Sequence, residues 1–185
     1  MNSPLDQMDG RFLRVNLLIT QGILLLIAMV ASFFIHTKET FIHLFQLSDR
    51  TSIIYGVLFA IIVVIISEGL ERVVPANWVA DGEINRRIFR NLSIPKTLCL
   101  CVLVGFCEEW LFRGVIQWWL GNGWTSLLFT LIHIRYLTKP LLLIMVFATS
   151  YCLGELFDLQ GSLWVPILAH SLLDFLSALI IQRRR

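Results

Sequence analysis

The chain has 185 residues, of which 57% are hydrophobic and only 15% are charged, and its mean hydropathy is +0.76. A water-soluble domain is about half apolar and about a quarter charged, so this composition excludes an ordinary soluble globule. Fifteen Lys and Arg stand against thirteen Asp and Glu, and the resulting net charge of +2 is too balanced to indicate a nucleic-acid partner. The composition indicates a protein that resides in a lipid bilayer and binds no nucleic acid.

Apolar runs long enough to cross ~30 Å of hydrocarbon recur along the chain. We expect spans at Val15–Ile35, Thr51–Ser67, Leu98–Leu120, Trp124–Ile134, Leu141–Phe157 and Leu163–Ile181. The fourth run has about 11 residues, which rise only ~17 Å as a helix, so a short or half-buried helix is expected there, after a turn at residues 121–123. The sequence thus predicts an all-α, polytopic bundle of about six transmembrane helices, forming a single integral membrane domain over residues 1–185.

Basic residues are distributed unevenly between the loops that these spans define, and loops that stay in the cytoplasm carry the excess of Lys and Arg. With both termini inside, the outer loops hold only Lys38 and Arg50, while Arg113 lies within a span. The other basic residues all fall on the inner side: Arg11, Arg14, Arg72, Arg86, Arg87, Arg90, Lys96, Arg135, Lys139, Arg183, Arg184 and Arg185. The chain is therefore expected in the cell membrane, with both termini cytoplasmic.

The longest polar stretch runs from Glu68 to Lys96 and contains Pro75 and an Asp81-Gly82 turn. It is expected to be a cytoplasmic loop near the membrane surface, whose basic residues serve as a topology anchor.

The four cysteines all lie inside apolar runs and lack the C-x-x-C pairing with histidines that is typical of zinc sites. We therefore expect Cys99, Cys101, Cys107 and Cys152 to be buried small hydrophobic residues.

Ionisable side chains also occur inside the predicted spans, where each costs at least ~2.5 kcal/mol on insertion scales and requires a partner or a function. They are Glu108, Glu109, Arg113 and His133 in the third and fourth spans, and Glu155, His170 and Asp174 in the fifth and sixth. Glu155 lies near a span end and is expected at the interface. From the rise per residue, Glu108, His133 and His170 lie roughly 15, 14 and 10 Å deep. One shared, water-containing cavity would satisfy all three.

Helical spacing assigns partners to the two adjacent glutamates. Glu109 and Arg113 are four residues apart on one face of the third span, which predicts a salt bridge between them. Glu108 is rotated about 100° from Glu109 and cannot share that salt bridge in the same way. It is therefore the freer carboxylate and the one suited to proton transfer.

The two histidines at membrane depth have helical neighbours of their own. His170 and Asp174 are four residues apart, which puts an imidazole and a carboxylate on one face of the last span. Phe129 and His133 have the same spacing, so the aromatic ring is expected to line the cavity beside the histidine.

These residues form three short motifs in chain order. They are Glu108-Glu109-Trp110-Leu111-Phe112-Arg113, Phe129-Thr130-Leu131-Ile132-His133 and His170-Ser171-Leu172-Leu173-Asp174. The set resembles the E-E-x-x-x-R, F-x-x-x-H and H-x-x-x-N/D motifs of the CPBP family, which comprises the type II CAAX prenyl endopeptidases and bacterial bacteriocin-processing and immunity-related membrane proteins. The resemblance covers about residues 98–181.

The resemblance implies an intramembrane endopeptidase that hydrolyses peptide bonds of membrane-associated or prenylated substrates. It places the pair Glu108 and Glu109 in the catalytic site, with Glu108 activating the attacking water and His133 helping to position that water. Arg113 and Phe129 would support this arrangement structurally.

His170 and Asp174 are implied to face the scissile carbonyl and to stabilise the oxyanion. An asparagine at the last motif position would donate an amide N–H, whereas an ionised aspartate only accepts. We therefore expect Asp174 to orient His170, and the oxyanion role to rest mainly on His170.

Such hydrolysis requires no cofactor, but the same side chains could bind a divalent metal such as zinc. Members of the family have been described both as metalloproteases and as glutamate-dependent proteases. The expected ligands of a metal are Glu108, His133 and His170, although the chain lacks the H-E-x-x-H pair of many zinc proteases.

Three non-enzymatic interpretations stay open. The polar residues could form a network that only fixes helix packing. The chain could be a membrane scaffold or bacteriocin self-immunity protein that binds a peptide in the same cavity without cutting it. A proton-coupled transporter is disfavoured because the chain is short and lacks a repeated half with interrupted helices.

Overall fold

Residues 9–47, 49–75, 78, 83–136 and 138–184 are described by the computed structural model of the chain, and its regular elements are all helices. A chain this apolar satisfies its backbone N–H and C=O groups inside helices, because a bilayer offers no water to bond them. The elements are α1 (Gly10–Ile35), α2 (Lys38–Leu44), α3 (Arg50–Val73), α5 (Glu83–Phe89), α6 (Ile94–Leu111), the π-helix η2 (Phe112–Ile116), α7 (Gln117–Ile132), the 3₁₀-helix η3 (Ile134–Tyr136), α8 (Pro140–Gln160) and α9 (Trp164–Arg183). The predicted all-α membrane bundle is confirmed.

In the described part of the chain, four helices are long and apolar enough to cross a membrane: α1, α3, α8 and α9. Most of their residues are not buried inside the protein, and Phe33 on α1, for example, is 81% exposed. Large exposed apolar surfaces of this kind suit contact with lipid. The predicted third and fourth spans correspond to α6, η2 and α7, where Glu108, Glu109 and Arg113 interrupt the apolar run.

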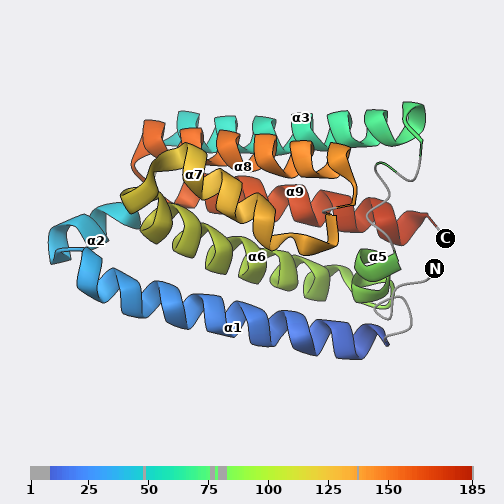
Figure 1. Cartoon of the computed structure of the whole chain (residues 1–185), viewed down its shortest axis with the longest axis horizontal. Coiled ribbons are helices and arrows are strands. Elements are labelled where there is room, and N and C mark those ends of the chain that lie inside the picture. The colour runs from blue at the N-terminus through green and yellow to red at the C-terminus, as the bar shows by residue number, and fades with distance from the viewer. Residues whose placement is uncertain (1–8, 48, 76–77, 79–82, 137, 185) are drawn as a thin grey trace.

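The long helices lie side by side, and Figure 1 shows that α1 and α3 run in opposite directions, as do α8 and α9. The beginning of α1 and the end of α9 lie at the same end of the bundle, whereas α2 lies at the opposite end.

The predicted polar loop from Glu68 to Lys96 is wrong at both of its ends. Helix α3 continues through Glu68 to Val73, and α6 already begins at Ile94. Between them, α5 is held by Arg14, which donates to Ile88 O at 3.0 Å, and by Gln182, which donates to Phe89 O at 2.7 Å. The predicted Asp81-Gly82 turn lies outside the described residues.

The cysteines divide into two classes. Cys101 and Cys107 are buried as predicted, but Cys99 and Cys152 are exposed, and all four are free thiols. The prediction of burial was wrong for the second pair because an apolar run suits a lipid-facing surface as well as a protein interior.

The chain reverses direction inside α7. Gly121 has a φ of 72°, a left-handed conformation that glycine adopts without a steric penalty, so the predicted turn is confirmed. Asn122 then donates to Tyr151 O at 2.9 Å and to Glu155 Oε1 at 3.0 Å, which ties the turn to α8. The returning part of α7 ends at Ile132 after about 11 residues, so His133 follows it ~17 Å from the turn.

Helix α9 packs closely against α6. A Cβ atom on Gly105 would overlap Ser171 Oγ and would lie 3.1 Å from Ser171 N, so only glycine permits this separation. Because Gly105 lies one turn before the two glutamates and Ser171 follows His170, the close approach brings Glu108 and Glu109 to His170.

Candidate active site

Glu109 and Arg113 form an ion pair that is completely buried. Arg113 Nε donates to Glu109 Oε2 at 3.0 Å, and the same guanidinium donates to Ser150 Oγ at 2.8 Å and to Gln117 Oε1 at 3.4 Å. The predicted salt bridge is confirmed. The residues of this network belong to α6, η2, α7 and α8, so this one charge pair connects four elements.

His170 bonds to the second carboxylate oxygen of Glu109. Its Nδ1 lies 2.7 Å from Glu109 Oε1. A carboxylate oxygen accepts, so Nδ1 carries the hydrogen. Glu109 therefore bridges Arg113 and His170, a contact between α6 and α9 that helical spacing within one span could not predict.

The other ring nitrogen of His170 faces two further carboxylates. His170 Nε2 lies 3.6 Å from Asp174 Oδ2 and 4.0 Å from Glu108 Oε2. Both separations exceed hydrogen-bond length, and polar groups at this range are commonly bridged by water. His170 and Asp174 share one helix face, as their spacing predicts.

Glu108 lies outside the ion pair, as predicted, but it has a partner that the spacing did not reveal. Gln21 Nε2 of α1 donates to Glu108 Oε1 at 2.9 Å. The Glu108 side chain is 13% exposed, whereas the Glu109 side chain is completely buried. The two adjacent glutamates thus occupy different environments.

His133 joins the cluster through Phe129. The His133 Nδ1–H donates to Phe129 O at 2.7 Å, so in a neutral ring Nε2 is the nitrogen with the lone pair. The Phe129 ring lies 4.7 Å from the His133 ring and 6.2 Å from the His170 ring, measured between centroids. The Arg113 guanidinium also lies over Phe129, at 5.9 Å.

Comparison with known proteins places this arrangement in a family. The family model described as type II CAAX prenyl endopeptidase Rce1-like matches residues 90–176. The uncharacterised protein YpbD of Bacillus subtilis (strain 168) is 39% identical over 156 residues, which are 84% of this chain and 82% of that protein. This chain belongs to the Rce1-like family. No solved structure matches it.

Membership confirms the family that the three motifs suggest, and it places the chain among the CAAX-type intramembrane proteases. Proteins of this kind work in a lipid bilayer on peptide or protein substrates. The matched region of this Rce1-like protein contains all three motifs, from Glu108 to Asp174, but it does not include Gln21.

The sequence interpretation missed the uncharged members of the site. Gln21, Gln117 and Ser150 are all buried, and each bonds to a glutamate or to Arg113. Amides and hydroxyls within apolar spans are the signal in the sequence that points to these residues.

Metal binding was the alternative raised for this site in the Rce1-like protein. Among the residues that the structure describes, no three His, Cys, Asp or Glu side chains are grouped so that they could hold a metal ion. The expected ligands Glu108, His133 and His170 do not form such a group among these residues.

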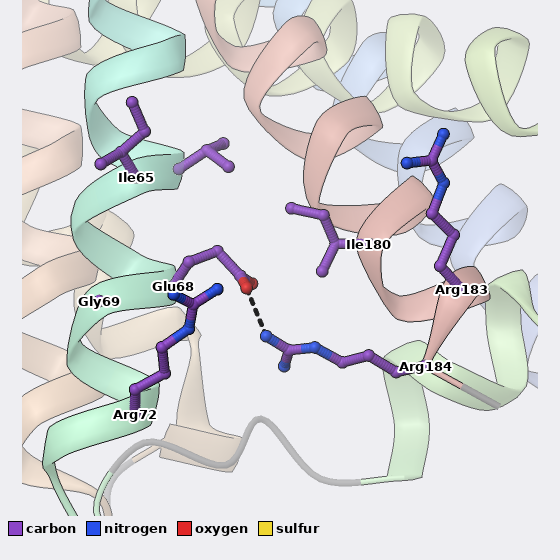
Figure 2. Close-up of a pocket in the computed structure, with 8 residues that line it drawn as sticks. Ile65, Glu68, Gly69, Arg72, Ile180, Arg183 and Arg184 are labelled. Atoms are coloured by element: carbon purple, nitrogen blue, oxygen red, sulfur yellow. Dashed lines mark hydrogen bonds and ion pairs between the residues drawn. The ribbon is translucent and has the colours of Figure 1, made fainter.

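A cavity of about 720 Å³ lies elsewhere, between α3 and α9 (Figure 2). Its lining comprises Val64, Ile65, Glu68, Gly69, Arg72, Ile180, Arg183 and Arg184. The Arg184 guanidinium pairs there with Glu68 and Glu71. None of the motif residues lines this cavity, so it is distinct from the glutamate and histidine cluster.

Proposed function

We propose that this Rce1-like protein is a glutamate-type endopeptidase of the cell membrane. It cleaves peptide bonds in membrane-associated or prenylated peptides and proteins, and both of its termini are cytoplasmic. The observation that carries the proposal is the contrast between the two glutamates. Both carboxylate oxygens of Glu109 are bonded, one to Arg113 and one to His170, whereas Glu108 Oε2 lies 4.0 Å from His170 Nε2.

A water molecule between these two atoms would be within hydrogen-bond reach of both, because each side of the bridge needs about 2.8 Å. Glu108 Oε2 takes a proton from this water, and the water oxygen attacks the carbonyl carbon of the scissile bond. The proton then passes from Glu108 to the leaving nitrogen as the C–N bond breaks. The products are a carboxylic acid, which keeps the second proton of the water, and an amine, and no covalent enzyme intermediate forms.

Negative charge on the former carbonyl oxygen is stabilised by His170. Its Nδ1–H is held by Glu109, and its Nε2 lies 3.6 Å from Asp174 Oδ2 and 4.0 Å from Glu108 Oε2. The Nε2–H holds the attacking water first, and it donates to the oxyanion once the water oxygen has bonded to the carbonyl carbon. An imidazole that is protonated on both nitrogens can donate to the oxyanion from Nε2. Asp174 orients this ring, and His133 helps to position the water.

The test is cleavage of a panel of membrane-presented peptides, prenylated and unprenylated, by purified protein in liposomes. Mass spectrometry identifies the new termini, and each reaction is repeated with a chelator. We expect a single cleavage site that is retained in the chelator. Loss of cleavage in the chelator would identify a metalloprotease, and no cleavage by well-folded protein would favour the scaffold or immunity alternative.

A further inference from the structure

Gln21 is a buried amide in the middle of an apolar helix. It is only 1% exposed, and its Nε2 donates to Glu108 Oε1 at 2.9 Å. Its own Oε1 is buried and has no hydrogen-bond partner among the described residues. An unpaired buried acceptor carries a desolvation penalty that an apolar side chain of the same size would avoid. Packing alone therefore does not explain a glutamine at this position.

The partners of the two adjacent glutamates differ in charge. Glu109 is neutralised by the full positive charge of Arg113, which commits it to a structural ion pair. Glu108 receives a hydrogen bond from a neutral amide, which orients the carboxylate without cancelling its negative charge. A general base needs this second arrangement, because it must be ionised and still able to accept a proton.

We propose that Gln21 is a positioning residue for Glu108, and this inference rests on the proposed function. By holding Oε1, the amide directs Oε2 toward His170 Nε2, where the attacking water is bound. The catalytic unit then includes α1, although the family match begins only at residue 90. Truncation of α1 would remove part of the active site, not merely a membrane anchor.

The experiment replaces Gln21 with methionine, which has nearly the same shape but no amide donor. With a peptide that the wild-type protein cleaves, Gln21→Met should lower kcat about tenfold to a hundredfold, as misplacement of a reacting group does, and leave KM within about twofold. Gln21→Asn should give the same loss, because its shorter amide withdraws the donor from Glu108. If both folded variants keep the wild-type kcat, or if only KM changes, the positioning role is wrong.

Ser32→Ala is the matched control. Ser32 is another buried polar residue of α1, and its Oγ accepts from Trp110 Nε1 of α6 at 3.0 Å. This substitution also removes one polar contact between α1 and α6, but it touches none of the proposed catalytic residues. It should lower the melting temperature and leave kcat unchanged, so equal losses of kcat in Ser32→Ala and Gln21→Met would contradict the inference.

A second measurement needs no substrate and separates this inference from the proposed function. Melting temperatures are compared for Gln21→Met, Glu108→Met and the double variant. Non-additive shifts establish that the two side chains interact, and additive shifts overturn the inference. If the shifts are non-additive but the wild-type protein cleaves nothing, the proposed function fails, and the role of Gln21 in catalysis fails with it.

Discussion

The adjacent carboxylates of Glu108 and Glu109 on α6 have different partners because neighbouring residues point to different sides of a helix. Glu109 points to Arg113 and His170 and is completely buried, whereas Glu108 points to Gln21 and keeps some exposure. A rotation of about 100° between neighbours is enough to separate the two environments. Glu109 is thus part of the framework, and Glu108 is the carboxylate that is placed to act on water.

Removal of Arg113 should leave a negative charge buried without a partner. We expect Arg113→Ala to lower the free energy of unfolding by about 3–5 kcal/mol, the range measured for broken buried ion pairs. Unfolding in detergent, followed by circular dichroism, measures the change. Arg184→Ala is the control, because Arg184 pairs with Glu68 and Glu71 while it is 48% exposed, and its loss should change stability by less than about 1 kcal/mol. Equal effects of the two variants would contradict the framework role of Arg113.

Asp174 offers a test of the oxyanion side of the site. Asparagine at this position adds a donor and keeps the shape, so Asp174→Asn should retain kcat within about tenfold. Asp174→Ala removes the group that orients His170, and kcat should fall about 10²- to 10³-fold. The two rates are measured on the same peptide, and an alanine variant as active as the wild-type protein would remove Asp174 from the mechanism.

Contacts within one helix were predictable at this scale, and contacts between helices were not. The pairs Glu109–Arg113 and His170–Asp174 follow from a four-residue spacing. The bonds from Glu109 to His170 and from Gln21 to Glu108 join residues that are far apart in the chain, and no periodicity specifies which helices meet.

At the scale of elements, a π-helix and a glycine set the positions of the helices that carry the site residues. The π-helix Phe112–Ile116 begins three residues after Glu109 and carries Arg113, and the extra residue in its turn rotates the chain that follows. His36, the residue after α1, bonds through its ring Nε2 to Gly114 O of this π-helix at 2.7 Å. The apolar run predicted the helix but not this local winding, because a π-turn leaves the hydrophobic pattern almost unchanged.

Gly105 sets the distance between α6 and α9. Gly105→Ala should push the helices apart and lower stability by about 1–3 kcal/mol, as overpacking does, and it should also reduce kcat because His170 moves from Glu109. Gly69→Ala is the control, since a Cβ atom on Gly69 of α3 meets nothing within 4 Å. Ser171→Ala should partly restore the Gly105→Ala variant. Failure of that rescue would contradict the proposed contact.

At the scale of the whole molecule, the described chain begins and ends at one end of the bundle (Figure 1). The excess of Lys and Arg predicts that this end faces the cytoplasm, and hydropathy predicted the order of the helices. The extent of α3 beyond Glu68 and the short helix α5 were not predictable, because polar residues continue a helix as readily as they form a loop.

Cysteine labelling tests this orientation. Cys99 and Cys152 are exposed and are first replaced by serine, whereas the buried Cys101 and Cys107 stay. The Lys38→Cys variant should react with an impermeant maleimide on intact cells. The Asn91→Cys variant should react only after lysis, and its labelling on intact cells would reverse the orientation.

The central claim is that Glu108 activates the water that cleaves the substrate. Glu108→Gln keeps the size of the side chain and an oxygen for the Gln21 amide, but it cannot take a proton. The decisive measurement is the single-turnover cleavage rate of this variant in liposomes, with its melting temperature recorded beside it. We expect a wild-type melting temperature and a rate lower by about 10²- to 10⁴-fold. A folded Glu108→Gln protein that cleaves at the wild-type rate would contradict the mechanism.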